Sequence, residues 1–189
     1  RVKTAVRIVR APFFTAVIIP ALAGAALAWS EGTLNGGYLA LTVLGIVCVN
    51  AGLNMSNDYF DHLSGNDEQN QNLTPFSGGS RVIQEGILVP RAVLAGSIMF
   101  YILGVAIGLY LAWARGWELL WIGALGVFIG IFHNAPPFKL YYLAPGVGEL
   151  AAGISCGPLI VLGSYYVQTQ QLSVEALWYT VDPANVYAD

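Results

Sequence analysis

The chain has 189 residues, of which 56% are hydrophobic and 10% are charged, and its formal net charge is −3. Its mean hydropathy is +0.62. Because an ordinary soluble domain carries about 25% charged residues, this composition excludes a soluble globular fold and predicts a multi-pass membrane protein. Cys48 and Cys156 both lie in apolar segments without metal-ligand spacing, so we interpret them as small core residues.

Five segments are apolar and long enough to cross a bilayer, since a membrane helix needs about 20 residues. In chain order the predicted spans are Phe13–Ser30, Tyr38–Ser56, Ala92–Ala114, Trp117–His133 and Gly146–Gln168. Pro20 and Pro158 interrupt two of them, which membrane helices tolerate where neighbours satisfy the freed carbonyls. A further apolar segment, Leu172–Val181, meets Asp182 too early to span. We therefore predict an all-α, multi-pass transmembrane helical bundle of about five spans plus an incomplete sixth, a single domain over residues 1–189 truncated at its C-terminus.

The distribution of cations predicts the orientation of these spans. With the N-terminus in the cytoplasm, only Arg115 lies outside. The other seven Lys and Arg residues lie inside, namely Arg1, Lys3, Arg7, Arg10, Arg81, Arg91 and Lys139. The two polar connections that carry chemistry, residues 57–91 and 134–145, then both face the cytoplasm. The outer connections are short and plain.

A polar stripe at the end of the second span is the feature most informative about function. On a helix it places four polar side chains on one face, at i, i+4, i+7 and i+11, namely Asn50, Asn54, Asn57 and Asp61. Such groups are costly to bury in hydrocarbon without partners. Asp67 and Glu68 follow closely, and carboxylates this dense favour a divalent cation, magnesium before zinc. The spacing Asn54-x-x-x-Asp58 offers a second ligand frame beside Asn57-x-x-x-Asp61.

The two cytoplasmic connections combine acidic and basic groups. The first, which we interpret as an active-site loop over residues 57–91, holds five carboxylates and two arginines, an arrangement suited to a magnesium-bridged polyphosphate. Its run Gly78-Gly79-Ser80-Arg81 offers backbone N–H groups to an anion, although most such runs are simply loops. In the second connection Lys139 is a point charge for phosphate. Tyr141 and Tyr142 are either hydrogen-bond donors or, with equal weight, members of an interfacial aromatic belt.

These motifs resemble those of a known family. Asn57-Asp58-Tyr59-Phe60-Asp61, followed by Gly65-Asn66-Asp67, is similar to the first aspartate-rich motif of the UbiA superfamily of intramembrane prenyltransferases. The MenA branch, which prenylates 1,4-dihydroxy-2-naphthoate in menaquinone biosynthesis, is the most similar. Three further stretches fit it in order: Arg10-Ala11-Pro12-Phe13-Phe14 leading to Pro20, Gly78-Gly79-Ser80-Arg81, and Pro136-Pro137-Phe138-Lys139-Leu140 with Gly146-Val147-Gly148-Glu149. The resemblance extends to about Gln168.

The resemblance implies an enzyme and assigns roles to its residues. It implies the N-terminal part of a larger bundle that transfers a polyprenyl group from its diphosphate to an aromatic acceptor with Mg²⁺. The ligands of metal and diphosphate would be Asn57, Asp61 and Asp67, with Asp58 as a further catalytic residue. Substrate-binding residues would be Arg10, Asn50, Asn54, Arg81, Lys139 and Tyr141. The expected partners are the donor, the acceptor and membrane lipid, without nucleic acid. The expected location is the cytoplasmic membrane of a prokaryote.

The sequence also departs from the family pattern and leaves alternatives open. The third position of the simpler family spacing is Gly65, so Asp67 serves only with two extra residues. A second aspartate-rich motif is expected after the fifth span, yet only Glu175, Asp182 and Asp189 remain there. Other acceptors known within the superfamily, a cation-handling transporter or channel, and an inactive fragment remain alternatives. The polar residues gather at one membrane face rather than at the midplane, which favours the enzyme over a transporter. For Asn50 and Asn54, interhelical hydrogen bonding is the structural alternative.

Overall fold

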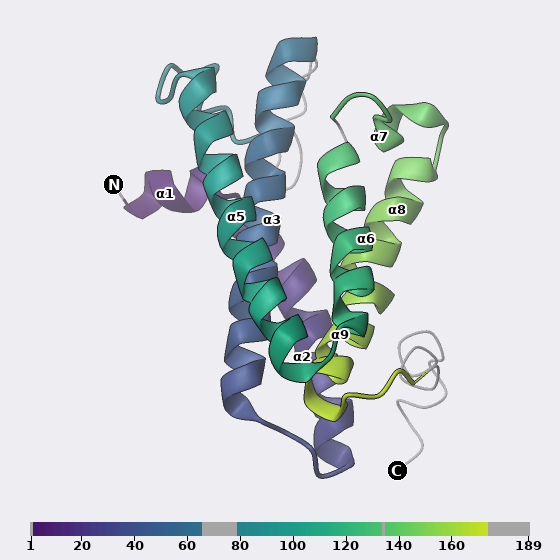
Figure 1. The fold of residues 1–189 in the computed structure, drawn as a ribbon. Coiled ribbons are helices and arrows are strands. Elements are labelled where there is room, and N and C mark those ends of the chain that lie inside the picture. The colour runs from purple at the N-terminus through teal and green to yellow at the C-terminus, as the bar shows by residue number, and fades with distance from the viewer. Residues whose placement is uncertain (1, 66–78, 134, 174–189) are drawn as a thin grey trace.

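The computed structural model describes residues 2–65, 79–133 and 135–173. Every regular element in these ranges is a helix, which confirms the all-α prediction. The elements are α1 (Val2–Ile8), the 3₁₀ helix η1 (Ala11–Phe14), α2 (Thr15–Ser30), α3 (Gly36–Ser64), α5 (Pro90–Arg115), α6 (Glu118–Phe132), α7 (Leu140–Leu143), α8 (Val147–Cys156) and α9 (Pro158–Thr169). Figure 1 shows the long helices running side by side, with α1 lying across them.

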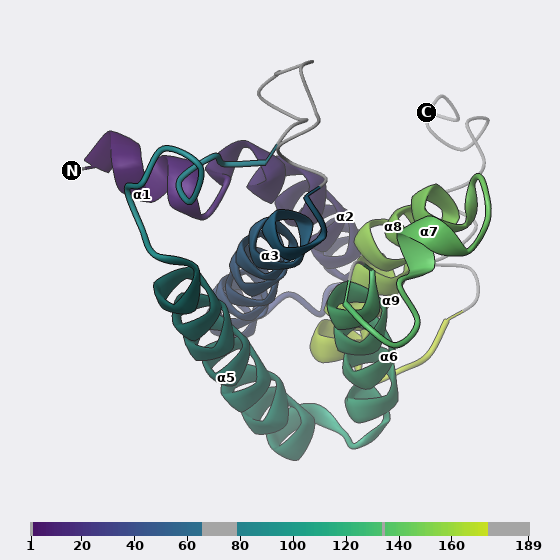
Figure 2. The ribbon, with the colours of Figure 1, turned by 90° about the horizontal axis from the view of Figure 1, so that it is seen from above.

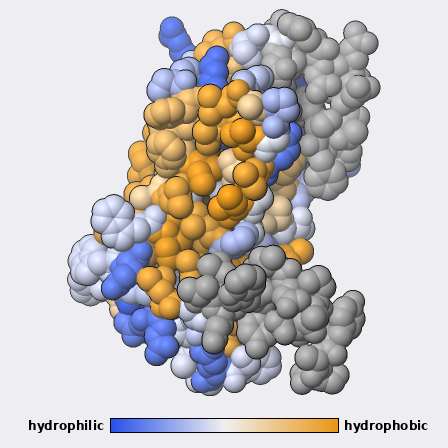
Figure 3. Space-filling view, turned by 90° about the vertical axis from the view of Figure 1, so that its right-hand side faces the viewer, coloured by the Kyte–Doolittle hydropathy of each residue, from blue (hydrophilic) through white to orange (hydrophobic). Residues whose placement is uncertain are grey.

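The bundle has the surface of an integral membrane protein. Four of its helical stretches are long and apolar enough to span, namely Ala11–Ser30, Gly36–Ser64, Pro90–Arg115 and Val147–Thr169. The predicted span Trp117–His133 corresponds to α6, an apolar helix of only 15 residues. The predicted incomplete sixth span lies almost wholly outside the described residues. Hydrophobic residues cover the middle of the face in Figure 3, and hydrophilic residues gather toward its two ends. An apolar surface of this extent requires lipid.

Helix α3 is longer than the bilayer that it crosses. It begins at the Asn35 cap, whose side chain accepts hydrogen bonds from the N–H groups of Gly37 and Tyr38 at 3.0 and 3.1 Å. It ends 29 residues later at Gly65, where φ is 72°. Such a helix is about 43 Å long, whereas the hydrocarbon core is about 30 Å thick. The predicted loop therefore begins after Ser64, and the polar stripe lies on the last turns of a continuous helix.

Small residues allow the helices to approach closely. The largest interfaces join α3 to α5 and α2 to α9. Ser97 on α5 donates a hydrogen bond to the carbonyl of Gly52 at 2.7 Å, and Ser164 on α9 donates to the carbonyl of Ala21 at 2.6 Å. Figure 2 shows α3 between α5 on one side and the group of α6, α8 and α9 on the other. Close backbone approach and hydroxyl-to-carbonyl bonds stabilise helix pairs in hydrocarbon, where the hydrophobic effect does not.

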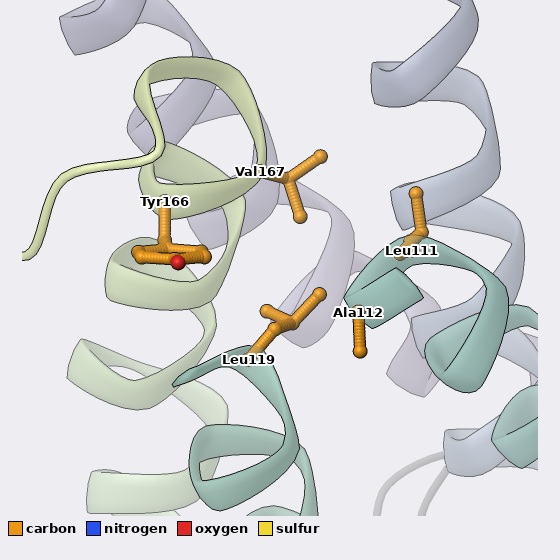
Figure 4. Packing of buried hydrophobic residues seen from close by; sticks show 5 residues of the cluster. All are labelled: Leu111, Ala112, Leu119, Tyr166 and Val167. Carbon is orange, nitrogen blue, oxygen red and sulfur yellow. The ribbon is translucent and has the colours of Figure 1, made fainter. Parts of the chain in front are cut away.

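The two ends of the bundle differ. We call the end that carries the C-terminus of α3, the connection of residues 79–89 and α7 the loop end (Figure 1). At the opposite, far end a buried apolar cluster joins α5, α6 and α9 (Figure 4); it consists of Leu111, Ala112, Leu119, Tyr166 and Val167. Arg115 lies beside it and donates hydrogen bonds to the carbonyls of Val167 and Gln168 at 2.6 and 2.8 Å. The far end is thus closed by packing and hydrogen bonds, and the loop end carries the last turns of the polar stripe.

We expect Gly24→Ala to destabilise the bundle, because a Cβ at Gly24 would collide with the carbonyl oxygen of Val161 on α9. Overpacking of this kind costs about 1–3 kcal/mol. Gly108→Ala on α5 is the matched control, since a Cβ there would meet nothing within 4 Å. Thermal unfolding in detergent checks the difference. Equal melting temperatures for the two variants would contradict the close packing of α2 on α9.

Candidate active site

The polar stripe divides into a buried edge and an open edge. Asn50, Asn54 and Asp58 are buried, and Asn57 and Asp61 are half-buried. Since each residue turns an α-helix by about 100°, these five side chains span an arc of about 100°, with Asn57 and Asp58 at its opposite limits. The predicted polar residues therefore share one face of α3. Asn57 and Asp58, at opposite sides of this face, have different neighbours.

On the buried edge the two asparagines hold each other and the N-terminal segment. The Asn54 amide donates hydrogen bonds to Oδ1 of Asn50 and to the carbonyl oxygen of Val9, both at 3.1 Å. Val9 directly precedes Arg10, whose backbone is left-handed with φ 53° and ψ 51°. Asn54 therefore makes the interhelical hydrogen bonds typical of membrane bundles, and it holds the peptide that leads into Arg10. Pocket lining by Asn50 and Asn54 stays a prediction.

Asp58 lies where two chain segments meet α3. Its Oδ1 accepts a hydrogen bond from the backbone N–H of Ser80 at 3.1 Å and lies 3.7 Å from Nη1 of Arg10. The side chains of Arg10 and Asp58 are only 15% and 4% exposed, so solvent screens this pair weakly. The guanidinium of Arg10 also lies 4.5 Å above the ring of Phe13. The structure thus brings together two residues that the sequence had assigned to separate roles.

The connection of residues 79–89, which we call the strap, crosses the end of α3 next to α1. Arg7 donates from Nε to the carbonyl of Ser80 at 2.7 Å and from Nη1 and Nη2 to Glu85 at 2.7 and 2.5 Å. These hydrogen bonds hold the pKa of the Glu85 carboxyl below its ordinary value and raise the pKa of Arg7. Val82 on the strap is fully buried. Arg81 has φ 58°, a left-handed conformation that is uncommon for a residue other than glycine.

The open edge faces the second connection. The Tyr142 hydroxyl on α7 donates to Oδ1 of Asp61 at 3.4 Å. The Asn57 side chain makes no hydrogen bond within the part of the chain that the structure describes. Lys139 caps the N-terminus of α7 and is exposed. The structure therefore brings the second connection to Asp61.

The two neighbouring tyrosines have different surroundings. The ring of Tyr141, the predicted substrate-binding residue, packs against His133 at 5.6 Å and sits over Gly148. Tyr142, which sequence reasoning left outside the site, is the one that reaches Asp61. The available signal was its position three residues after Lys139, which is one helical turn.

The open edge supplies ligands that suit magnesium only in part. In residues 2–65, 79–133 and 135–173 no group of three His, Cys, Asp or Glu side chains is placed to hold a metal. Asp67, the third predicted ligand, lies outside the described residues. Asn57 and Asp61 provide two oxygen ligands one turn apart. Because Mg²⁺ is usually held by one or two carboxylates together with substrate phosphates, this pair fits a cation shared with a diphosphate.

An apolar helical bundle that carries acidic, amide and cationic groups at one end defines an integral membrane protein with a polar site at the membrane surface. Residues 17–182 match the model of the UbiA prenyltransferase family, so the chain belongs to that family. This confirms the resemblance seen in the aspartate-rich motif.

Relatives with assigned functions act on naphthoate compounds or carry the family name. The chain is 30% identical over 167 residues to a 2-carboxy-1,4-naphthoquinone phytyltransferase of Synechocystis sp., covering 87% of this chain and 51% of that protein. It is 33% identical over 153 residues to a 1,4-dihydroxy-2-naphthoate octaprenyltransferase of Mycobacterium tuberculosis, covering 80% and 49%. It is 28% identical over 171 residues to the UbiA prenyltransferase domain-containing protein 1 of Homo sapiens, covering 89% and 48%. The chain spans about half the length of these curated relatives.

The Arg7–Glu85 pair predicts a dependence of stability on pH. Because the pKa of Glu85 is lower in the folded protein than its ordinary 4.5, the pair stabilises the fold above pH 4.5 and loses this contribution as the pH falls through the folded pKa. We expect Glu85→Gln to lower the melting temperature in detergent at neutral pH and to equal the unsubstituted protein well below pH 4.5. Arg7→Gln should show the same loss at neutral pH and an additional loss that persists at acidic pH, because it also removes the hydrogen bond to the carbonyl of Ser80. A difference that persisted at acidic pH in Glu85→Gln would contradict a charge-based contact.

Proposed function

We propose that the protein is a membrane prenyltransferase that moves a polyprenyl group from its diphosphate to 1,4-dihydroxy-2-naphthoate. The observation that carries the proposal is the open edge of α3, where Asn57 and Asp61 lie opposite the connection that holds Lys139 and Tyr142 in a chain of the UbiA prenyltransferase family. The naphthoate acceptor follows from the names of relatives that are 24–33% identical. A product of this kind belongs to menaquinone biosynthesis.

We propose the following roles for the residues. Asn57 and Asp61, with Asp67, hold Mg²⁺ against the donor diphosphate; when bound, the cation neutralises charge on the diphosphate oxygens. Arg81 and Lys139 stabilise the negative charge that grows there as the bond between allylic carbon and oxygen breaks and its electron pair leaves with the diphosphate. A ring carbon of the acceptor then bonds to the allylic cation, and the ring releases a proton.

The acceptor and the isoprenoid need different surroundings. The carboxylate of the naphthoate matches a guanidinium, and Arg10 is the candidate beside the buried edge. Asn50, Asn54 and Tyr141 are proposed to contact substrate at the same end. The polyprenyl tail is apolar and suits the lipid-facing helices, which also keep water from the cation.

We also propose that the loop end and the N-terminus face the cytoplasm, in the cytoplasmic membrane of a prokaryote. The support is the position of the cations. Arg81 lies in the connection of residues 79–89 and Lys139 precedes α7, both at the loop end. Arg10 contacts Asp58 on the last turns of α3, and Arg115 contacts Val167 at the far end. Cytoplasmic connections carry the excess of Lys and Arg.

The first test is prenyl transfer in membranes that contain the protein. Radiolabelled polyprenyl diphosphate is incubated with 1,4-dihydroxy-2-naphthoate, with and without Mg²⁺. We expect magnesium-dependent product, and a loss of about 100-fold or more in Asp61→Ala, because a charge-stabilising group is removed from the leaving group. Glu31→Gln is the control, since Glu31 lies at the far end and accepts its hydrogen bonds from Tyr165.

Each outcome of this assay has a distinct meaning. Product with another aromatic acceptor alone would retain the transferase and replace the naphthoate. Full activity in Asp61→Ala would remove the open edge from the mechanism. An absence of product with every acceptor, together with cation flux in liposomes, would replace the enzyme by a transporter.

A second test concerns the tyrosines. We expect Tyr142→Phe to lower the transfer rate by about 2- to 10-fold, because Asp61 loses one hydrogen bond that orients it. Tyr141→Phe is the matched control and keeps its ring contacts with His133. Rates are measured at saturating and at limiting Mg²⁺. A larger loss in Tyr141→Phe would return the substrate-contacting role to Tyr141, as first predicted.

A further inference from the structure

We propose that Asn54 and Asp58 are positioning residues: they hold Arg10 and Arg81 in place, and Asp58 is not a metal ligand. The proposal rests on the proposed function, because its purpose is to present two cations to a diphosphate or carboxylate. The proposal also gives different roles to the two ligand frames between which the sequence could not decide. The frame Asn54-x-x-x-Asp58 organises the site, and the frame Asn57-x-x-x-Asp61 binds the metal.

Both arginines have the same unusual backbone. Arg10 has φ 53° and Arg81 has φ 58°, so both lie in the left-handed region. A residue with a side chain is strained there, at a cost of order 1–3 kcal/mol, and keeps this conformation only where its surroundings impose it. Arg10 and Arg81 are far apart in the chain, yet both keep this strained backbone near the end of α3. Their surroundings therefore fix their positions.

Helix α3 binds a backbone group of the residue that precedes each arginine. Asn54 donates to the carbonyl of Val9, which leads into Arg10. Asp58 accepts from the N–H of Ser80, which leads into Arg81, and the carbonyl of Ser80 accepts from Arg7. The peptide groups on both sides of Ser80 are therefore fixed, one by a buried carboxylate and one by a guanidinium. Two residues of one helical face thus bind the backbone of two distant segments, Asn54 as a donor and Asp58 as an acceptor.

Asp58 and Arg10 form a largely buried pair of opposite charges. Asp58 is 3% exposed and lies 3.7 Å from Nη1 of Arg10, whose side chain is also largely buried. Removing one partner of a buried pair leaves the other charge uncompensated, so each needs the other. On the arc of the stripe Asp58 is the limit farthest from Asn57. Its Oδ1 thus contacts Arg10 and the strap, on the side of α3 away from Asn57.

The first experiment needs no enzyme activity. Trypsin cleaves after Arg81 only when the strap leaves α3, so the cleavage rate reports that opening. We expect Asp58→Ala to speed this cleavage about tenfold or more, because the loss of one charged hydrogen bond is worth that factor. Asp58→Asn keeps an acceptor for the Ser80 N–H and should stay within about threefold of the unsubstituted rate. Asp61→Ala is the matched control, and its rate should not change. Mass spectrometry identifies the cleaved bond.

The second experiment separates positioning from metal binding. In membranes that contain the protein, we expect Asp58→Asn to lower kcat/KM for the donor by about 10- to 100-fold, because a misplaced cation loses its effect. The Mg²⁺ concentration for half-maximal rate should be unchanged. Asp61→Asn should raise that concentration instead. The double variant Arg10→Gln/Asp58→Asn should be no slower than Arg10→Gln alone, because residues that act through one contact are not additive.

The outcomes distinguish this proposal from the proposed function. A raised Mg²⁺ requirement in Asp58→Asn equal to that in Asp61→Asn would make Asp58 a ligand and overturn the proposal. Unchanged cleavage after Arg81 in Asp58→Ala would overturn it as well. If the unsubstituted protein transfers no prenyl group, the proposed function fails, and the cleavage rates still decide whether Asp58 holds the strap.

Discussion

A polar group that enters hydrocarbon must find its partner inside the protein, and the bundle is organised around this requirement. Ser97 and Ser164 meet it by donating to carbonyls of neighbouring helices, which brings the helices close. Asn54 meets it at the carbonyl of Val9, so the N-terminal segment is held against α3. The same rule accounts for the length of α3. Its last turns carry more polar groups than hydrocarbon tolerates, and the helix is long enough to bring them to the bilayer surface.

The proposed site depends on which chain segments contact each edge of the polar stripe on α3. Neighbouring segments cover one edge of the stripe, where Asp58 pairs with Arg10 and accepts a hydrogen bond from Ser80. On the other edge Asp61 is half-buried and accepts a hydrogen bond from Tyr142 of the second connection. A site that binds a diphosphate needs both kinds of surface: a rigid part that places its cations, and an accessible part that meets the ligand. One helix supplies both because its side chains spread over an arc rather than a line.

The arginine at the far end has different surroundings from the arginines at the loop end. Arg115 is a half-buried cation whose hydrogen bonds go to the carbonyls of Val167 and Gln168, and its guanidinium lies 4.9 Å from the ring of Tyr38. These contacts close the bundle, and the Arg115 guanidinium donates its hydrogen bonds to backbone carbonyls. Arg10 and Arg81 instead project from strained turns beside carboxylates. Membership of the UbiA prenyltransferase family agrees with chemistry at the loop end.

The amino-acid sequence by itself determined the helical membrane class, the approximate spans, the family and the stripe, because hydropathy and helical spacing are local properties. It did not determine that α6 is short, that Tyr142 rather than Tyr141 reaches Asp61, or which aspartate frame is open. These depend on contacts between segments far apart in the chain, such as residues 10 and 58 or 61 and 142. Sequence spacing alone allows either Asp58 or Asp61 to be a metal ligand, because both lie near the same end of the helix. Only the neighbours that pack against each edge decide which carboxylate is buried in an ion pair and which faces the second connection.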